Sequence, residues 1–315
     1  MLQPIIEVKN LVKKYRKAST NAVDDISFEV FPGEFFTFLG PNGAGKTTTI
    51  SILTTTLSKT SGSIKISGFD SEKQSSSVRQ NIGIIFQNPS LDLNLTAEEN
   101  IRFHCVLYGL YKFAPTFELM DRIYRKRVEE LAEILSLKKD MFLPLKTFSG
   151  GMKRKLEIVR SLMHKPKILF LDEPTVGLDP LSRKTLWEYL TQVKKNEKMT
   201  VFLTTHYLEE AEGADRVCII NKGKIVMLDT PKVIKQKLTN EYVSLDSKDR
   251  MKLKGELVKK GLEFTENGRF KVKVKKISAA EIVQSLKTKL TFIDVHNPSL
   301  EDAYLEIIGE KNEGN

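Results

Sequence analysis

The sequence contains no apolar run long enough to cross a bilayer. Of its 315 residues, 40% are hydrophobic, but runs such as residues 82–86 and 168–171 are far shorter than the roughly 20 residues that a membrane-spanning helix needs. The first residues include Pro4 and Glu7 and hold no long apolar segment, so we expect no secretory signal. The sequence therefore predicts a chain that does not cross a membrane by itself.

Cysteine is scarce, and like charges are not grouped in blocks. The two cysteines, Cys105 and Cys218, lie far apart in the sequence, which favours reduced thiols of a cytosolic protein over a disulfide framework or a metal site. The formal net charge is +10, but the lysines and arginines are spread along the chain. An ordinary solvated surface is therefore favoured over attraction to the anionic inner leaflet of a membrane.

Short apolar segments alternate with helical patterns over most of the chain. Strands are predicted at residues 5–8, 26–30, 35–39, 64–66, 82–86, 168–171 and 200–204, with a turn at 61–63. Helices are predicted at residues 47–57, 149–163 and 182–194, and helical spacing prevails between 96 and 137, where Thr96 and Glu99 form a capping-box pattern. Alternation of strands with helices predicts parallel pairing in a sheet flanked by helices, which is an α/β fold.

The pattern changes after about residue 232. Residues 270–275 alternate strictly between apolar residues and lysine, which is typical of a strand with one solvent-exposed face. A further strand is predicted at 290–295, between helical stretches at 279–287 and 300–309. These elements predict a small α+β domain at the C-terminal end.

A glycine-rich loop follows the apolar segment at 35–39. Its residues match the pattern G-x-x-x-x-G-K-[ST] and are Gly40, Pro41, Asn42, Gly43, Ala44, Gly45, Lys46 and Thr47. Glycines let backbone N–H groups turn toward phosphates, and a helix that begins near Lys46 adds further N–H groups and a partial positive charge. Lys46 can reach the outer phosphates, and the Thr47 hydroxyl suits Mg²⁺. The predicted nucleotide site also includes Thr48, which adjoins the loop.

Two acidic residues follow the buried strand predicted at 168–171. Asp172 and Glu173 would lie at the carboxyl edge of a parallel sheet, where ligands bind. Asp172 is placed to hold Mg²⁺, and Glu173 can act as a general base on the attacking water. The alternative, two acids that merely cap the following turn, loses weight because the phosphate loop lies upstream.

A second glycine pair gives the sequence a family resemblance. Phe148, Ser149, Gly150, Gly151 and Met152 resemble the LSGGQ signature of ATP-binding cassette (ABC) proteins, in the SGGMKR form common among exporter subunits. A serine and two glycines that open a helix form an anion site without a lysine. In the family, this site binds the γ-phosphate of ATP that the other subunit holds, so Ser149, Gly150 and Gly151 would act in trans.

Other positions match the same family in order. Tyr15 falls where an aromatic residue stacks on adenine, although residues 17–20 look like a small insertion. Gln87 matches the Q-loop glutamine, which contacts Mg²⁺ or water and senses the membrane subunit. Asp179 matches the D-loop, which crosses the dimer interface, and His206 matches the switch histidine at the γ-phosphate.

The resemblance implies the organisation of the whole chain. It implies a P-loop NTPase core with a mixed sheet flanked by helices in a nucleotide-binding domain at 1–230, with a helical signature subdomain at about 88–160. Residues 231–315 would form a small C-terminal accessory or regulatory domain, and residues 297–304 resemble the tail of the daunorubicin-resistance type of exporter ATPase. The implied activity is hydrolysis of ATP with Mg²⁺, by an ATP-dependent homodimer or heterodimer that powers transmembrane permease subunits. The implied location is peripheral, on the cytoplasmic face of the cell membrane.

Three other classes of protein share parts of this pattern. Chromosome-maintenance and DNA-repair ATPases carry coiled coils or zinc-binding cysteines inside the cassette, and translation-associated relatives carry two cassettes in one chain. Neither feature is present in the sequence, so no nucleic acid is expected as a partner; the third class is a regulatory ATPase without transport. The sequence leaves open the transported substrate, whether drug, lipid, polysaccharide or sodium, and whether the C-terminal domain regulates or stabilises the dimer.

Overall fold

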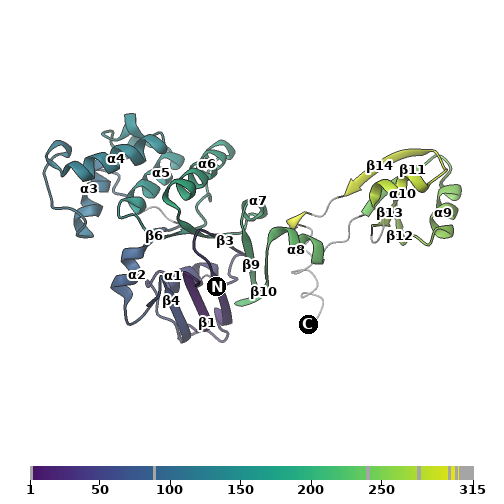
Figure 1. The fold of residues 1–315 in the computed structure, drawn as a ribbon, viewed down its shortest axis with the longest axis horizontal. Helices are drawn as coiled ribbons and strands as arrows, with labels where there is room; N and C mark the ends of the chain where they lie inside the picture. The colour runs from purple at the N-terminus through teal and green to yellow at the C-terminus, as the bar shows by residue number, and fades with distance from the viewer. Residues whose placement is uncertain are drawn as a thin grey trace. The chain divides into compact units, whose positions relative to one another are not determined.

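The computed structural model describes residues 3–87, 90–238, 242–274, 278–296, 299–301 and 304. The chain divides into two compact units, Met1–Leu228 and Asp229–Asn315, which run from purple to green and from green to yellow in Figure 1. Within the described ranges, no helix has both the length and the apolar character that a bilayer crossing requires.

The first unit contains an antiparallel sheet with the strand order β2-β1-β4-β5. Its strands are β1 (Ile6–Lys13), β2 (Val23–Val30), β4 (Ser61–Ile66) and β5 (Phe69–Asp70). The turn predicted at 61–63 is wrong, because Ser61 and Ser63 pair with Val12 and Lys9 of β1 and extend the strand. Pairing with a neighbouring strand thus outweighs the local turn preference of serine and glycine.

The second sheet of this unit has six strands in the order β10-β9-β3-β8-β7-β6. They are β3 (Phe35–Leu39), β6 (Ile82–Ile85), β7 (Ile168–Asp172), β8 (Thr200–Thr205), β9 (Arg216–Asn221) and β10 (Lys224–Asp229). The pairs β6/β7, β7/β8, β3/β8 and β3/β9 are parallel, as the alternation of elements predicts. The carboxyl ends of β3, β7 and β8 therefore meet at one edge.

Side chains alternate between two cores on either face of this sheet. Leu169, Val201 and their neighbours on one face pack in a core that includes residues of α3 (Ala97–Leu107), α4 (Arg122–Ile134), α5 (Gly150–Leu162) and α6 (Pro180–Glu197). Phe170, Phe202 and other side chains of the opposite face pack with the antiparallel sheet and α1 (Lys46–Leu53). Figure 1 shows helices α3 to α6 on one side of the six-stranded sheet and strands β1 and β4 on the other. Burial on both faces explains why β7 is apolar along its length until Asp172.

The helix boundaries follow local capping signals. The Thr96 hydroxyl accepts from the Glu99 N–H at 3.2 Å, and the Glu99 carboxylate accepts from the Thr96 N–H at 2.8 Å, so the predicted capping box is confirmed. Ser149 caps α5 as expected. Helix α1 ends earlier than predicted, at Leu53, where Thr54 and Thr56 hydroxyls bond to backbone carbonyls of the last turn.

The second unit contains a four-stranded sheet with the order β12-β13-β11-β14. Its elements are α8 (Pro231–Leu238), β11 (Tyr242–Ser247), α9 (Arg250–Lys259), β12 (Phe264–Asn267), β13 (Arg269–Lys273), α10 (Ala279–Ser285) and β14 (Leu290–His296). Phe270 and Val272 of β13 are buried with α9 and α10 while Lys271 is exposed, as the alternation predicts. The helix predicted at 300–309 and the tail resemblance at 297–304 lie largely outside the described residues.

Candidate nucleotide site

The glycine-rich loop connects β3 to α1 at the carboxyl edge of the six-stranded sheet. A Cβ atom on Gly40 would lie 2.3 Å from the Ile220 carbonyl oxygen, and one on Gly45 would lie 2.5 Å from that of Ala22. Gly45 also has a φ of 107°, in the left-handed region that favours glycine. Both positions therefore require glycine, and the chain that they bend leads into the N-terminus of α1 at Lys46.

The Lys46 side chain is buried beneath this loop. Its Nζ donates to the carbonyl oxygens of Gly40 at 2.8 Å and Pro41 at 3.2 Å, and lies 3.1 Å from Glu173 Oε1. A buried ammonium group needs such acceptors. Its partners on the loop are neutral carbonyls, so the cation can also interact with an anion that enters the loop.

Asp172 ends β7 beside two threonine hydroxyls. Its Oδ1 accepts from Thr204 Oγ1 at 2.5 Å and from Thr47 Oγ1 at 3.4 Å. Burial raises the pKa of this carboxyl group, and the Thr204 hydrogen bond opposes the shift. A hydroxyl and a carboxylate at this spacing are oxygen donors of the kind that Mg²⁺ prefers.

Glu173 lies among three of the polar groups that the sequence singles out. Its Oε2 accepts from Gln87 Nε2 at 3.3 Å and is 3.4 Å from His206 Nδ1, and its Oε1 contacts Lys46. The backbone of Glu173 has a φ of 45°, and its N–H donates to the Thr204 carbonyl oxygen at 3.1 Å. The structure therefore brings Gln87, Glu173 and His206 together next to the phosphate-type loop.

These groups border a cavity of about 290 Å³. Its lining consists of Ala22, Asn42, Gly43, Gly45, Lys46, Thr47, Thr48, Gln87 and Glu173. Tyr15 is 44% exposed, and its hydroxyl lies 3.3 Å from Thr48 Oγ1. The predicted adenine-stacking residue is thus next to this end of the loop.

The signature residues and Asp179 form a second group that does not line this cavity. The Ser149 hydroxyl accepts from the Met152 N–H at 3.2 Å at the start of α5. A Cβ on Gly151 would lie 2.9 Å from Ser182 Oγ, and this hydroxyl donates to Asp179 Oδ2 at 2.6 Å. Ser182 therefore connects the signature with the Asp179 segment.

Arg154 is a site residue that the sequence reasoning missed. This buried arginine of α5 donates to the carbonyl oxygens of Gln87 and Glu173, at 3.3 and 3.5 Å. It also pairs with Glu157 at 2.8 Å. The sequence signal that could have indicated its role is the spacing of an arginine and a glutamate three residues apart, on the buried side of one helix.

The arrangement defines a P-loop nucleotide-binding protein: a Gly-Lys-Thr loop between a parallel strand and a helix, with an acidic pair on a neighbouring strand. Residues 23–176 match the protein-family model for ABC transporters. With relatives that align over almost its whole length, the chain belongs to this family and is an ATP-binding cassette of the ABC ATPase type.

Three curated relatives illustrate the similarity. The chain is 32% identical to the doxorubicin resistance ATP-binding protein DrrA of Mycobacterium tuberculosis, over 98% of this chain and 95% of the relative. It is 40% identical to the linearmycin resistance ATP-binding protein LnrL of Bacillus subtilis, over 72% of this chain and 69% of the relative. Identity to the probable multidrug ABC transporter ATP-binding protein YbhF of Escherichia coli is 37% over 76% of this chain, which spans only 39% of that relative.

Solved structures show the same cassette fold. An ATP-binding subunit of an ABC transporter has a TM-score of 0.63 and 30% identity, covering 74% of this chain and 92% of that one. The cassette MJ0796 in a dimeric post-hydrolysis state with ADP and phosphate has a TM-score of 0.62 and 25% identity, covering 71% and 98%.

Proposed function

We propose that the protein is the ATP-hydrolysing subunit of a membrane exporter and drives partner permease subunits from the cytoplasmic face. The observation that carries this proposal is the position of the Glu173 carboxylate, beside Lys46, Gln87 and His206 at the glycine-rich loop. The names of the drug-resistance relatives support export. In this proposal residues 1–230 are the nucleotide-binding domain, with the helical subdomain at about 88–160, and residues 231–315 are an accessory domain.

Each polar group has a role in hydrolysis. The backbone N–H groups of the glycine-rich loop and of the first turn of α1, together with the Lys46 ammonium, would bind the phosphates, while Tyr15 would contact the adenine. Mg²⁺ would be held by Thr47, Asp172 and Gln87, and it would supply positive charge against the phosphates. Among the described residues there is no group of three or more His, Cys, Asp or Glu side chains that could hold a metal alone, so phosphate oxygens would complete the ligand set.

Glu173 is proposed as the general base that accepts a proton from the attacking water. Its Oε2 is within 3.3 to 3.4 Å of Gln87 and His206, so these two side chains can orient both the carboxylate and the water. His206 is also proposed to donate to the γ-phosphate. The Lys46 contact with the other carboxylate oxygen must be exchanged for phosphate when ATP binds.

We propose that ATP is bound between two copies of the cassette. Ser149, Gly150, Gly151 and Asp179 do not line the cavity of their own protomer, yet Ser149 and the glycines open a 13-residue helix with N–H groups available for an anion. They would bind the γ-phosphate of ATP on the partner protomer, and two of the structures similar to this chain are dimers. Both sites of a homodimer would be competent; a heterodimer would pair the chain with a second ATPase subunit.

Replacing the general base while keeping the shape of the side chain tests this proposal. Glu173→Gln is expected to lower ATP turnover by about 10²- to 10⁴-fold while nucleotide binding persists, so that ATP-bound dimers accumulate. Light scattering after size exclusion, with and without saturating Mg·ATP, measures the dimer. The matched control is Glu129→Gln on the exposed side of α4, which should keep normal turnover. A Glu173→Gln protein that stays monomeric in saturating ATP would contradict the two-copy site.

The permease subunits are proposed to bind the helical subdomain. Helix α3 and the residues after it expose apolar side chains, with Leu107 85%, Tyr108 58% and Phe113 58% exposed. Phe103 and Phe113 lie ring to ring at 6.2 Å. A group of exposed aromatic and aliphatic side chains supports a protein-binding face at this position.

A further inference from the structure

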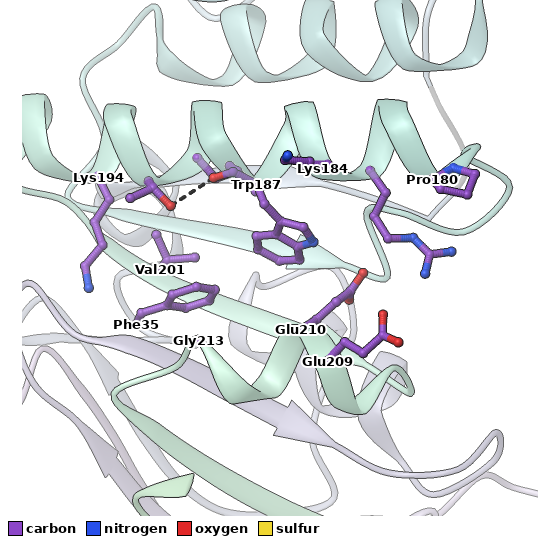
Figure 2. Close-up of a pocket in the computed structure, with 12 residues that line it drawn as sticks. Phe35, Pro180, Lys184, Trp187, Lys194, Val201, Glu209, Glu210 and Gly213 are labelled. Carbon is purple, nitrogen blue, oxygen red and sulfur yellow. Dashed lines mark hydrogen bonds between the residues drawn. The ribbon is translucent and has the colours of Figure 1, made fainter. Parts of the chain in front are cut away.

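A second cavity, of about 530 Å³, lies between α6 and the six-stranded sheet. Figure 2 shows Trp187 projecting from α6 toward Phe35 and Val201 of the sheet, with Glu209 and Glu210 of α7 (Leu208–Glu212) nearby. The rings of Trp187 and Phe35 are 5.8 Å apart and tilted by 31°. This cavity shares no lining residue with the nucleotide cavity, so its apolar wall serves no part of the proposed hydrolysis.

The charged side chains that line this cavity differ in how far their hydrogen-bonding groups have partners. The carboxylate of Glu210 bonds to the hydroxyls of Thr175 and Thr205, and Lys194 pairs with Asp215 at 2.9 Å. Arg183 also lines the cavity, and its buried Nε has no hydrogen-bond partner in the part of the chain that the structure describes. An apolar aromatic wall beside a guanidinium group with a free donor is complementary to a flat ligand that carries an anion.

Three contacts connect this cavity to the proposed catalytic carboxylate. The Arg183 guanidinium lies 4.4 Å from the centre of the Tyr207 ring. The Tyr207 ring is 4.0 Å from the His206 ring, and His206 Nδ1 is 3.4 Å from Glu173 Oε2. A ligand that attracts the guanidinium would therefore disturb the ring that supports the switch histidine.

We propose that this cavity binds a small aromatic carboxylate, and that binding lowers ATP turnover by drawing Arg183 away from Tyr207. The aromatic part packs against Trp187 and Phe35, and the carboxylate pairs with Arg183. The regulatory half of this inference rests on the proposed roles of His206 and Glu173, whereas the binding half does not.

Trp187 makes occupancy directly measurable, because it is the only tryptophan of the chain. The full-length protein without nucleotide is titrated with biphenyl-4-carboxylate and, separately, with the neutral biphenyl-4-methanol, while tryptophan fluorescence is recorded. The carboxylate should give a saturable change and bind more tightly than the alcohol. Arg183→Gln should weaken its binding by about tenfold, the value of one lost charged hydrogen bond. No saturable change, or equal affinity for acid and alcohol, would overturn the proposal.

Two glycine variants locate the binding. Gly213 lines the cavity, its φ is −82°, and a Cβ there meets no atom within 4 Å, so Gly213→Phe can fill the space without backbone strain. Gly255 of α9 offers equal room and does not line the cavity, which makes Gly255→Phe the matched control. The fluorescence change should disappear in Gly213→Phe and persist in Gly255→Phe; unchanged binding in Gly213→Phe would place the ligand elsewhere and refute the site.

The regulatory half is tested by steady-state ATP hydrolysis. Saturating biphenyl-4-carboxylate should lower kcat about fivefold or more with little change in KM for ATP, and Arg183→Gln should lose most of this response even at concentrations that restore occupancy. Measurable turnover that a saturating probe leaves unchanged would refute the coupling. A protein without any turnover would instead refute the proposed function, and the fluorescence titration would still decide whether the cavity binds the acid.

Discussion

Replacing Arg154 should separate the stability of the cassette from the positioning of its proposed catalytic groups. The guanidinium group is buried in α5 and donates to the carbonyl oxygen of Pro174 at 2.7 Å and to those of Gln87 and Glu173. It is also paired with Glu157 Oε2 at 2.8 Å. One side chain thus connects the helix that the signature opens to the segments of Gln87 and Glu173, two of the proposed catalytic groups.

The expected loss of stability follows from the Glu157 carboxylate, which would stay buried without its arginine partner. Removing one partner of a buried ion pair costs about 3 to 5 kcal/mol, because the other charge stays buried without compensation. Glu157 Oε1 keeps a bond from the Ser90 N–H at 3.1 Å and Arg160 at 3.9 Å, so we expect the lower end, about 3 kcal/mol. Arg154→Met should therefore lower the free energy of unfolding by about 3 kcal/mol. Arg154→Met/Glu157→Leu should recover at least about half of this loss, since an apolar pair tolerates burial.

Urea denaturation followed by circular dichroism measures these values, with the transition of the first unit fitted separately because two compact units need not unfold together. Lys153→Met, on a partly buried neighbour, is the control and should change stability little. The single variant Glu157→Leu completes the comparison. If the double variant loses as much unfolding free energy as Arg154→Met and Glu157→Leu lose together, the two residues are not coupled and the reasoning fails. ATP turnover should stay low in the double variant, because the backbone at Gln87 and Glu173 loses its anchor; full activity there would exclude the positioning role.

Two further predictions concern α3. Burial, together with the nearby charges of Arg160 and His164, lowers the pKa of His104 from 6.5 to about 4. The folded state thus disfavours a proton that the unfolded state accepts, and the associated stability is present above pH 6.5 and lost as the pH falls toward 4. The loss, of order 3 kcal/mol, should be smaller in His104→Asn when unfolding curves are compared between pH 7 and pH 4. Leu107→Lys should reduce co-purification with the permease subunits and leave ATP-driven dimerisation of Glu173→Gln intact; equal co-purification would contradict the docking face.

The parallel core could be predicted because burial leaves a direct mark on the sequence. Strands β7 and β8 are covered on both faces and read as short apolar runs, and α5 begins at a serine cap. The strand order could not be predicted, since β3 lies between β8 and β9 and this depends on long-range packing. Strands β9 and β10 were not predicted either; β9 is buried in its central residues only, and β10 is partly exposed along its length.

The motifs named most groups of the site but not the geometry that brings them together. Gln87 and His206 were assigned by position in a pattern, and only the structure shows that both reach the same oxygen of Glu173. The sequence assigns no role to Thr204 or to Arg154, although Arg154 ends the SGGMKR segment, because a threonine on a buried strand and an arginine on a helix are common. Their importance comes from partners more than 15 residues away in the sequence.

The adjacent acids illustrate how a local backbone feature divides two roles. Consecutive side chains of a regular strand point to opposite faces, so Asp172 and Glu173 could not both reach one ligand if β7 simply continued. At Glu173 the backbone enters the left-handed region with a φ of 45°, at a cost of about 1 kcal/mol or more for a residue with a Cβ. Two acceptors on Thr204 hold the Glu173 N–H there, while the same threonine hydroxyl donates to Asp172. One residue of β8 thus bonds to the Asp172 carboxylate and to the Glu173 N–H, while the Glu173 carboxylate contacts Gln87 and His206. This arrangement supports the proposed division of roles, in which Asp172 would serve a cation and Glu173 a water.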